Sequence, residues 1–89
     1  PDDPSILNNL ANAYKKNHQH DEAISHYLKA IALRSNYAQA HNNLATIYAS
    51  QGKYHDALNH YKLAVHAEPD FSTAHFNLGL LLLQNNHLA

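Results

Sequence analysis

Apolar residues recur along this chain with the spacing of one face of an α-helix. The first set stands at i, i+3, i+4 and i+7 and comprises Leu7, Leu10, Ala11 and Tyr14. After a polar break over residues 17–21, a similar spacing returns at Ala23, Tyr27 and Ala30. Such a period is typical of amphipathic helices. The pattern therefore predicts a helix, a turn and a second helix within residues 4–37, with the residues of the first set in the core.

This unit is repeated at a fixed interval. The stretch "LNNLANAY" at 7–14 returns as "HNNLATIY" at 41–48 and, more loosely, as "HFNLGLLL" at 75–82, 34 residues apart each time. Aligning 4–37 with 38–71 gives these identical pairs: Asn8/Asn42, Asn9/Asn43, Leu10/Leu44, Ala11/Ala45, Tyr14/Tyr48, Ala23/Ala57, His26/His60, Tyr27/Tyr61 and Ala30/Ala64. Such self-similarity indicates a repeat protein. We predict one domain with repeats 4–37 and 38–71 and a partial repeat 72–89. Its first helices are expected near 5–17, 38–51 and 72–84, and its second helices near 21–33 and 55–67.

Turn and capping residues agree with this division. Asp21 and Asp56 lie near the starts of second helices, where a carboxylate favours the helix dipole. Gly52 follows a first helix, as a left-handed helix stop would, and Pro69 closes the second repeat. The recurring alanines would let helices approach closely, with tyrosines filling the gaps. Because a helix of about 13 residues is marginal alone in water, stacking on neighbours must stabilise each one.

The composition excludes several classes of function. The chain has 89 residues, a net charge of −1 and no cysteine. It therefore lacks a global positive field for nucleic acid or an anionic membrane, and disulfides, thiolate chemistry and zinc–thiolate sites are excluded. The longest apolar run, 78–83, is far shorter than the roughly 20 residues of a membrane span. The first residue is not methionine, and we expect a piece of a longer array.

The second copy resembles a tetratricopeptide repeat. The residues that carry the resemblance are His41, Leu44, Ala45, Tyr48, Gly52, Ala57, Tyr61, Ala64 and Pro69. The first copy matches at Leu7, Leu10, Ala11, Tyr14, Ala23, Tyr27 and Ala30. It has His18 in place of Gly and Ser35 in place of Pro, which leaves its turn geometry open. The third copy keeps Leu78 and Gly79 but has Leu82 in place of Tyr, and Pro1 falls at the register of Pro69. The resemblance implies an all-α superhelical solenoid whose first helices line a concave groove.

One groove position is asparagine in all three copies, at Asn9, Asn43 and Asn77. An amide offers two donors and an acceptor, so it can pair with the N–H and C=O of a bound peptide without reading its side chain. The row is similar to the asparagine ladder of O-linked N-acetylglucosamine transferases. The alternative is a set of solvated consensus residues. The neighbouring Asn8 and Asn42 are expected to be plain surface.

Other groove residues allow two readings each. Lys15 and Lys16 either attract an acidic ligand or are simply solvated. Phe76, Leu80 and Leu83 stand at i, i+4 and i+7, and either form an apolar pocket or are covered by a neighbouring element. The remaining expected groove residues are Asn12, Gln39, Thr46 and Thr73. A carboxylate clamp for chaperone tails is disfavoured, because it needs cations at positions held by Asn8, Asn12, Asn43, Thr73 and Asn77.

The nine histidines do not predict a metal site. No two of them stand at i, i+3 or i, i+4, the spacing that helical zinc pairs need. His41 and His75 are expected to be packing residues, because they occupy the large-residue core position. His26 and His60 are expected to face outward.

The predicted function is to bind an extended protein segment in the groove. No catalytic constellation is present, and no cofactor, nucleic-acid partner or membrane partner is expected. Two alternatives are the substrate-recruiting arm of a larger enzyme, such as a glycosyltransferase, and a self-assembling scaffold. Leu78, Leu81 and Leu82 are expected to face the place of a second helix in repeat three, which favours self-association through helix 72–84.

Overall fold

The computed structural model describes residues 3–87, and its regular structure in that range is entirely helical. The helices are α1 (Pro4–Lys16), α2 (His20–Leu33), α3 (Ala38–Ser50), α4 (Tyr54–Ala67) and α5 (Ser72–His87). The predicted all-α solenoid is therefore confirmed, with α5 longer than expected. Pro1 and the side chain of His87 lie outside the residues described.

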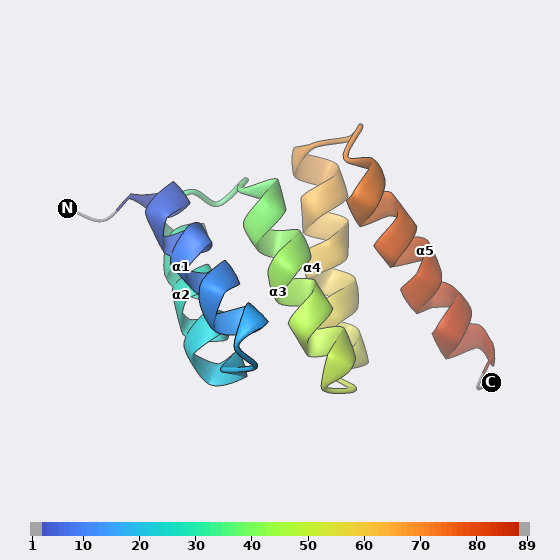
Figure 1. Cartoon of the computed structure of the whole chain (residues 1–89). Helices are drawn as coiled ribbons and strands as arrows, with labels where there is room; N and C mark the ends of the chain where they lie inside the picture. The colour runs from blue at the N-terminus through green and yellow to red at the C-terminus, as the bar shows by residue number, and fades with distance from the viewer. Residues whose placement is uncertain (1–2, 88–89) are drawn as a thin grey trace.

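The helices form two layers (Figure 1), with α1, α3 and α5 in front of α2 and α4. The first helices α1 and α3 each pack against the second helix of their own repeat, and α2 and α4 each pack against the next first helix. The result is elongated, measuring 45 × 28 × 17 Å, and the two chain ends lie at opposite ends of the stack. Residues far apart in sequence meet only across neighbouring repeats, as expected for a solenoid.

The turns within the two repeats have the same geometry although their residues differ. His18 has a φ of 61° and Gly52 a φ of 75°, so both occupy the left-handed region typical of a helix stop. In each turn the next backbone N–H donates to the carbonyl of the tyrosine in the preceding helix, at 2.9 Å. The replacement of glycine by His18 in repeat one therefore leaves the turn unchanged.

The core is built from alanines and tyrosines, as their spacing predicts. Ala11, Ala23, Ala30 and Tyr27 are completely buried in one cluster. Leu44 of the next repeat is also completely buried in this cluster. The small alanines leave room for this leucine, so the core is continuous from one repeat to the next.

Leu10, which was expected in the core, is 41% exposed. Its equivalent in repeat two, Leu44, is buried against repeat one. The residue at this register thus packs on the preceding repeat, and no repeat precedes Leu10 in the described chain. The core assignment was wrong for Leu10 because the covering surface comes from another repeat.

The expected orientation of the leucines on α5 also needs correction. Leu81 is only 6% exposed and packs with Ala45, Ala57 and Tyr61 of repeat two. Leu78 is half-buried against the same cluster, whereas Leu82 is 39% exposed. Leu81 shares its register with the buried Ile47, so it faces the preceding repeat and not the position of a following helix.

The packing of Leu44 on repeat one can be tested by truncation. We expect Leu44→Ala to lower the free energy of unfolding by about 2–5 kcal/mol, since it opens a cavity between two repeats. Leu10→Ala, at the same register but exposed, should have a much smaller effect. Urea titration followed by circular dichroism measures both, and equal losses would contradict the stacking described here.

Candidate functional site

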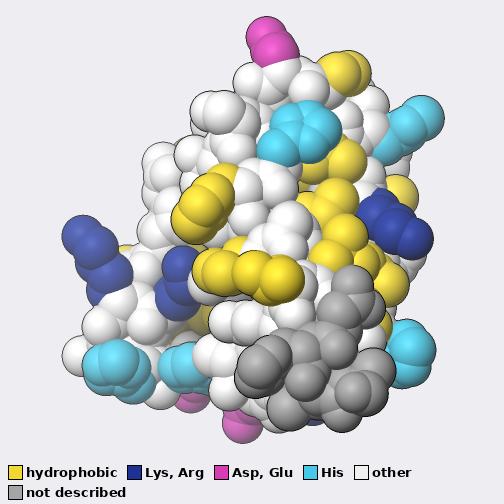
Figure 2. Space-filling view, turned by 90° about the vertical axis from the view of Figure 1, so that its right-hand side faces the viewer, with side chains coloured by type: hydrophobic (Ala, Val, Ile, Leu, Met, Phe, Trp, Pro, Cys, Tyr) yellow, Lys and Arg dark blue, Asp and Glu magenta, His cyan; other side chains and the backbone are white. Residues whose placement is uncertain are grey.

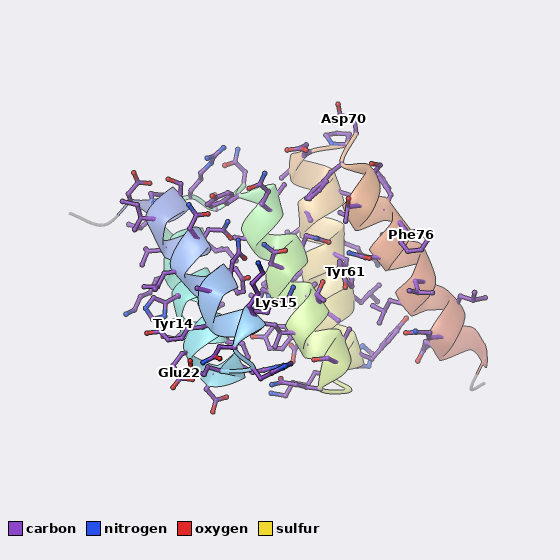
Figure 3. All side chains as sticks on the ribbon, in the orientation of Figure 1. Tyr14, Lys15, Glu22, Tyr61, Asp70 and Phe76 are labelled. Atoms are coloured by element: carbon purple, nitrogen blue, oxygen red, sulfur yellow. The ribbon has the colours of Figure 1, made fainter. Side chains whose placement is uncertain are left out.

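The residues expected in the groove lie along α1, α3 and α5, which together form what we call the groove face. A first depression of about 690 Å³ is lined by Asn9, Asn12, Ala13, Lys15, Lys16, His18 and Asn43. A second depression of about 280 Å³ is lined by Thr46, Ala49, Ser50, Tyr61, Asn77, Leu80, Leu81 and Gln84. Figure 3 shows Lys15 projecting from α1 toward α3. Most of the expected residues are thus brought together in two adjoining hollows.

Four expected residues lie outside these two depressions. Gln39 lines a separate hollow of about 260 Å³ near the loop between repeats, together with Arg34 and Glu68. Thr73 is exposed near the start of α5. Phe76 and Leu83 are 69% and 66% exposed on α5. Sequence reasoning missed Ala13, His18 and Leu81 of the first helices and their turns, and Tyr61, which lines the second depression from α4.

The asparagine row makes hydrogen bonds between repeats. The Nδ2 of Asn43 donates to the Oδ1 of Asn12 at 3.0 Å, and the Nδ2 of Asn77 donates to the Oδ1 of Asn42 at 3.2 Å. Each amide therefore reaches back to the repeat before it. The side chain of Asn9, in the first repeat, forms no hydrogen bond within residues 3–87 and is exposed.

Tyr27 adds a second hydrogen bond to the contact between Asn43 and Asn12. Its hydroxyl donates to the Oδ1 of Asn12, the same oxygen that accepts from Asn43. Burial raises the pKa of Tyr27 to about 12, so the phenol keeps its proton and remains a donor at neutral pH. In repeat two the equivalent pair is Tyr61 and Thr46, whose oxygens are 3.0 Å apart.

Most of the hydrogen-bonding capacity of Asn43 and Asn77 is unused within the described residues. An asparagine has two N–H donors and an oxygen acceptor, and Asn43 and Asn77 each use one donor between repeats. Within the described part of the chain, neither of their Oδ1 atoms has a hydrogen-bond partner. Both side chains are half-buried. A donor and an acceptor at each step of the row can therefore bind a ligand.

Asn8 and Asn42, expected to be plain surface, are in fact buried, with exposures of 2% and 5%. Asn42 accepts from Asn77 of the next repeat, so this register faces the following first helix. The Oδ1 of Asn8 has no partner among the described residues, because Asn43 bonds Asn12 instead. The third residue at this register is Phe76, which stays exposed since no further first helix follows in the described chain.

The histidines on α3 and α5 hold the loops between repeats. The Nε2 of His41 lies 2.8 Å from the carbonyl oxygen of Ser35, and the Nε2 of His75 lies 2.7 Å from that of Pro69. Since a carbonyl only accepts, each Nε2 carries the proton. His41 is buried as expected, whereas His75 is exposed, so packing alone does not describe its role.

His26 and His60 do not face outward as expected. His26 is half-buried with its ring centroid 5.1 Å from that of Tyr14. His60 is half-buried between His41 and Tyr48, with ring centroids 5.2 Å and 5.7 Å away. This register of the second helix packs on the tyrosine of its own first helix, which explains both cases.

His41 and His60 share a hydrogen bond with one defined direction. Their Nδ1 atoms are 3.0 Å apart. Because the proton of neutral His41 is on Nε2, its Nδ1 accepts and the Nδ1–H of His60 donates. Burial, together with His41, lowers the pKa of His60, and the Asp56 carboxylate opposes this shift. Among the described residues no group of three or more His, Asp or Glu could hold a metal ion.

Comparisons with known proteins agree with this architecture. A family model described as "Tetratricopeptide repeat" matches residues 2–66, and a second with the same description matches residues 44–89. No curated protein matches the chain at a significant level.

Within the described residues, no helix combines the length and apolar character needed to traverse a membrane.

Two solved structures are similar over 93% of this chain. A crystal structure of MamA superposes with a TM-score of 0.88 at 26% sequence identity. A tetratricopeptide repeat protein from Parabacteroides merdae superposes with a TM-score of 0.85 at 25% identity. The chain spans only 48% and 32% of those two proteins.

The lowered pKa of His60 makes the stability of the domain depend on pH. The unfolded chain, in which the His60 pKa is near its ordinary value of 6.5, binds a proton more readily than the folded one. This contribution to stability is complete above about pH 6.5 and is lost as the pH falls below that value. We therefore expect the Tm to fall between about pH 7.5 and 5.

The variant His60→Gln should show a shallower fall in Tm over the same range. His66→Gln, a matched change at an exposed histidine of α4, should keep the slope of the parent protein. Thermal unfolding followed by circular dichroism at several pH values decides the matter. If His60→Gln keeps the full pH dependence, the His41–His60 pair does not cause it.

Proposed function

Since the chain belongs to the tetratricopeptide repeat family, whose repeats generally mediate protein–protein interaction, we propose that its groove face binds an extended peptide segment of another protein. The observation that carries the proposal is the row of Asn9, Asn43 and Asn77. Asn43 and Asn77 line the two depressions, and each keeps a donor and an acceptor without a partner among the described residues. An extended peptide presents its own N–H and C=O groups at regular intervals, and each amide is proposed to pair with one such N–H and C=O.

The two depressions offer the side-chain contacts that the amides do not provide. Backbone hydrogen bonds bind any sequence equally, so selectivity must come from side-chain contacts on either side of the row. The first depression contains Lys15, Lys16 and His18. The second contains Leu80, Leu81 and Tyr61. A ligand held by its backbone at the row would place side chains in both hollows.

The role of the whole protein is part of the proposal. The asparagine row is similar to that of O-linked N-acetylglucosamine transferases, in which such an array accompanies a catalytic region. The chain spans less than half of either solved relative. We propose that this chain performs recognition and carries no reactive site of its own, whether it serves an enzyme that recruits substrates or a scaffold.

Association of two copies through α5 is the second candidate. Four large apolar side chains on this helix are exposed: Phe76, Leu80, Leu82 and Leu83. Figure 2 shows hydrophobic side chains gathered on the face that α5 presents. Sedimentation across a concentration series tests this, and Leu82→Glu with Leu83→Glu should shift a dimer toward monomer, because a buried unpaired carboxylate is costly. A monomer at all concentrations would exclude it.

The backbone-binding proposal is tested most cleanly at Asn9. This amide forms no bond to another repeat, so its removal does not loosen the stack. Against a peptide selected from a random display library, Asn9→Ala should weaken binding about fivefold, for the loss of about 1 kcal/mol. Isothermal titration measures it.

The control is Asn59→Ala, at an exposed asparagine on α4, which should leave the affinity unchanged. The triple change at Asn9, Asn43 and Asn77 should weaken binding by roughly two decades and also lower the Tm, since it removes the bonds to Asn12 and Asn42. A triple variant that binds within twofold of the parent would refute the proposed role of the row.

A further inference from the structure

The acidic residues of this domain are segregated from its first helices. The sequences of α1, α3 and α5 contain no Asp or Glu, and their only formal charges are Lys15 and Lys16. The acidic residues in the described range lie on α2, on α4, in connecting segments or, for Asp3, at the N-cap of α1: Asp3, Asp21, Glu22, Asp56, Glu68 and Asp70. Figure 3 shows Glu22 and Asp70 at opposite edges of the molecule, away from Lys15.

This segregation gives the groove face a positive potential at one end. Lysines in the last turn of α1 are favoured by the helix dipole, which explains a base at that place but not the lack of acid along three helices. Both lysines line the first depression with the amides of Asn9, Asn12 and Asn43. A hollow lined by one sign of charge concentrates the field and attracts the opposite charge. Ammonium and amide donors together are suited to a carboxylate.

The chemistry changes along the groove face at constant register. Lys15, Ala49 and Leu83 are equivalent positions of successive first helices, as are Asn12, Thr46 and Leu80. Both rows pass from polar in repeat one, through a small side chain, to apolar on α5. In Figure 2 lysine or arginine side chains lie beyond the hydrophobic side chains on the left of the view. The gradient follows the path of a peptide that crosses the three helices in turn.

We propose that the segment bound by the groove face is acidic where it crosses α1 and apolar where it crosses α5. This inference rests on the proposed function, because it specifies the ligand of the same site. Neighbouring packed helices are about 8–10 Å apart, so α1 and α5 are separated by about 16–20 Å. An extended chain advances about 3.3 Å per residue, which places the acidic and apolar side chains about five or six residues apart.

The experiment uses defined synthetic peptides. The test peptide carries two Asp residues and, about six residues along, Leu and Phe, in a background of Ser, Thr and Ala, in both orders. One control has Lys in place of Asp, and another has Ser in place of Leu and Phe. Fluorescence anisotropy should show the acidic–apolar peptide binding about five- to tenfold more tightly than either control, as expected for two exposed ion pairs or two apolar contacts.

Variants of the protein assign the preference to the groove face. Lys15→Gln with Lys16→Gln should abolish the preference for Asp over Lys while keeping the preference for Leu and Phe. Lys29→Gln with Lys62→Gln removes two exposed lysines from α2 and α4 and should change neither. Added salt should weaken the binding of the acidic peptide. It should leave unchanged the binding of a counterpart peptide without the two Asp charges.

The experiment distinguishes a failure of this inference from a failure of the proposed function. If the Asp and Lys peptides bind equally, or if the Lys15 and Lys16 changes leave the preference intact, the inference is overturned while peptide binding stands. If neither these peptides nor any member of a random library binds, the proposed function fails as well. If poly(U) RNA displaces the acidic peptide and binds more tightly, the positive hollow serves nucleic acid and the inference is wrong.

Discussion

The structure depends on the burial of each first helix against the repeat that precedes it. Leu44 packs among Ala11, Ala23 and Tyr27 with no exposed surface. In the next repeat Leu81, which is 6% exposed, packs against Ala57 and Tyr61. Helices of this length are marginal alone, so nearest-neighbour packing supplies most of their stability. Alanines at the contacts allow the close approach, and that approach sets the distance between successive first helices.

This spacing has a direct chemical consequence on the groove face. It brings the asparagines of adjacent first helices within hydrogen-bond distance, so the row that we propose binds peptide is also part of the repeat interface. Asn43 and Asn77 each donate one hydrogen bond to the preceding repeat. This hydrogen bond fixes the orientation of the amide. Less side-chain conformational entropy is therefore lost when a ligand binds. The repeat interface and the proposed recognition thus use the same side chains.

The helices, the turn at Gly52 and the alanine–tyrosine core could be read from the sequence, because each depends on local spacing that repeats every 34 residues. The errors have a common origin. Asn42 and Leu81 are buried, His60 is half-buried and Leu10 is exposed, because a solenoid covers several sides of a helix with different neighbours. A single apolar face assigned from one helix does not show which polar side is covered by the next repeat. The placement of the groove residues in two hollows required the relative position of the helices, which spacing alone does not provide.

The central claim is that the asparagine row contacts the bound peptide, and the side-chain amide resonances of asparagine test it directly. In a titration with a selected peptide, NMR spectra should show the Nδ2 protons of Asn9, Asn43 and Asn77 shifting together and saturating at the same ligand concentration. The resonances of Asn36 and Asn59, which lie off the groove face, should stay in place. Shifts confined to α2, to α4 or to the exposed side of α5, with the three groove amides unmoved, would contradict the account.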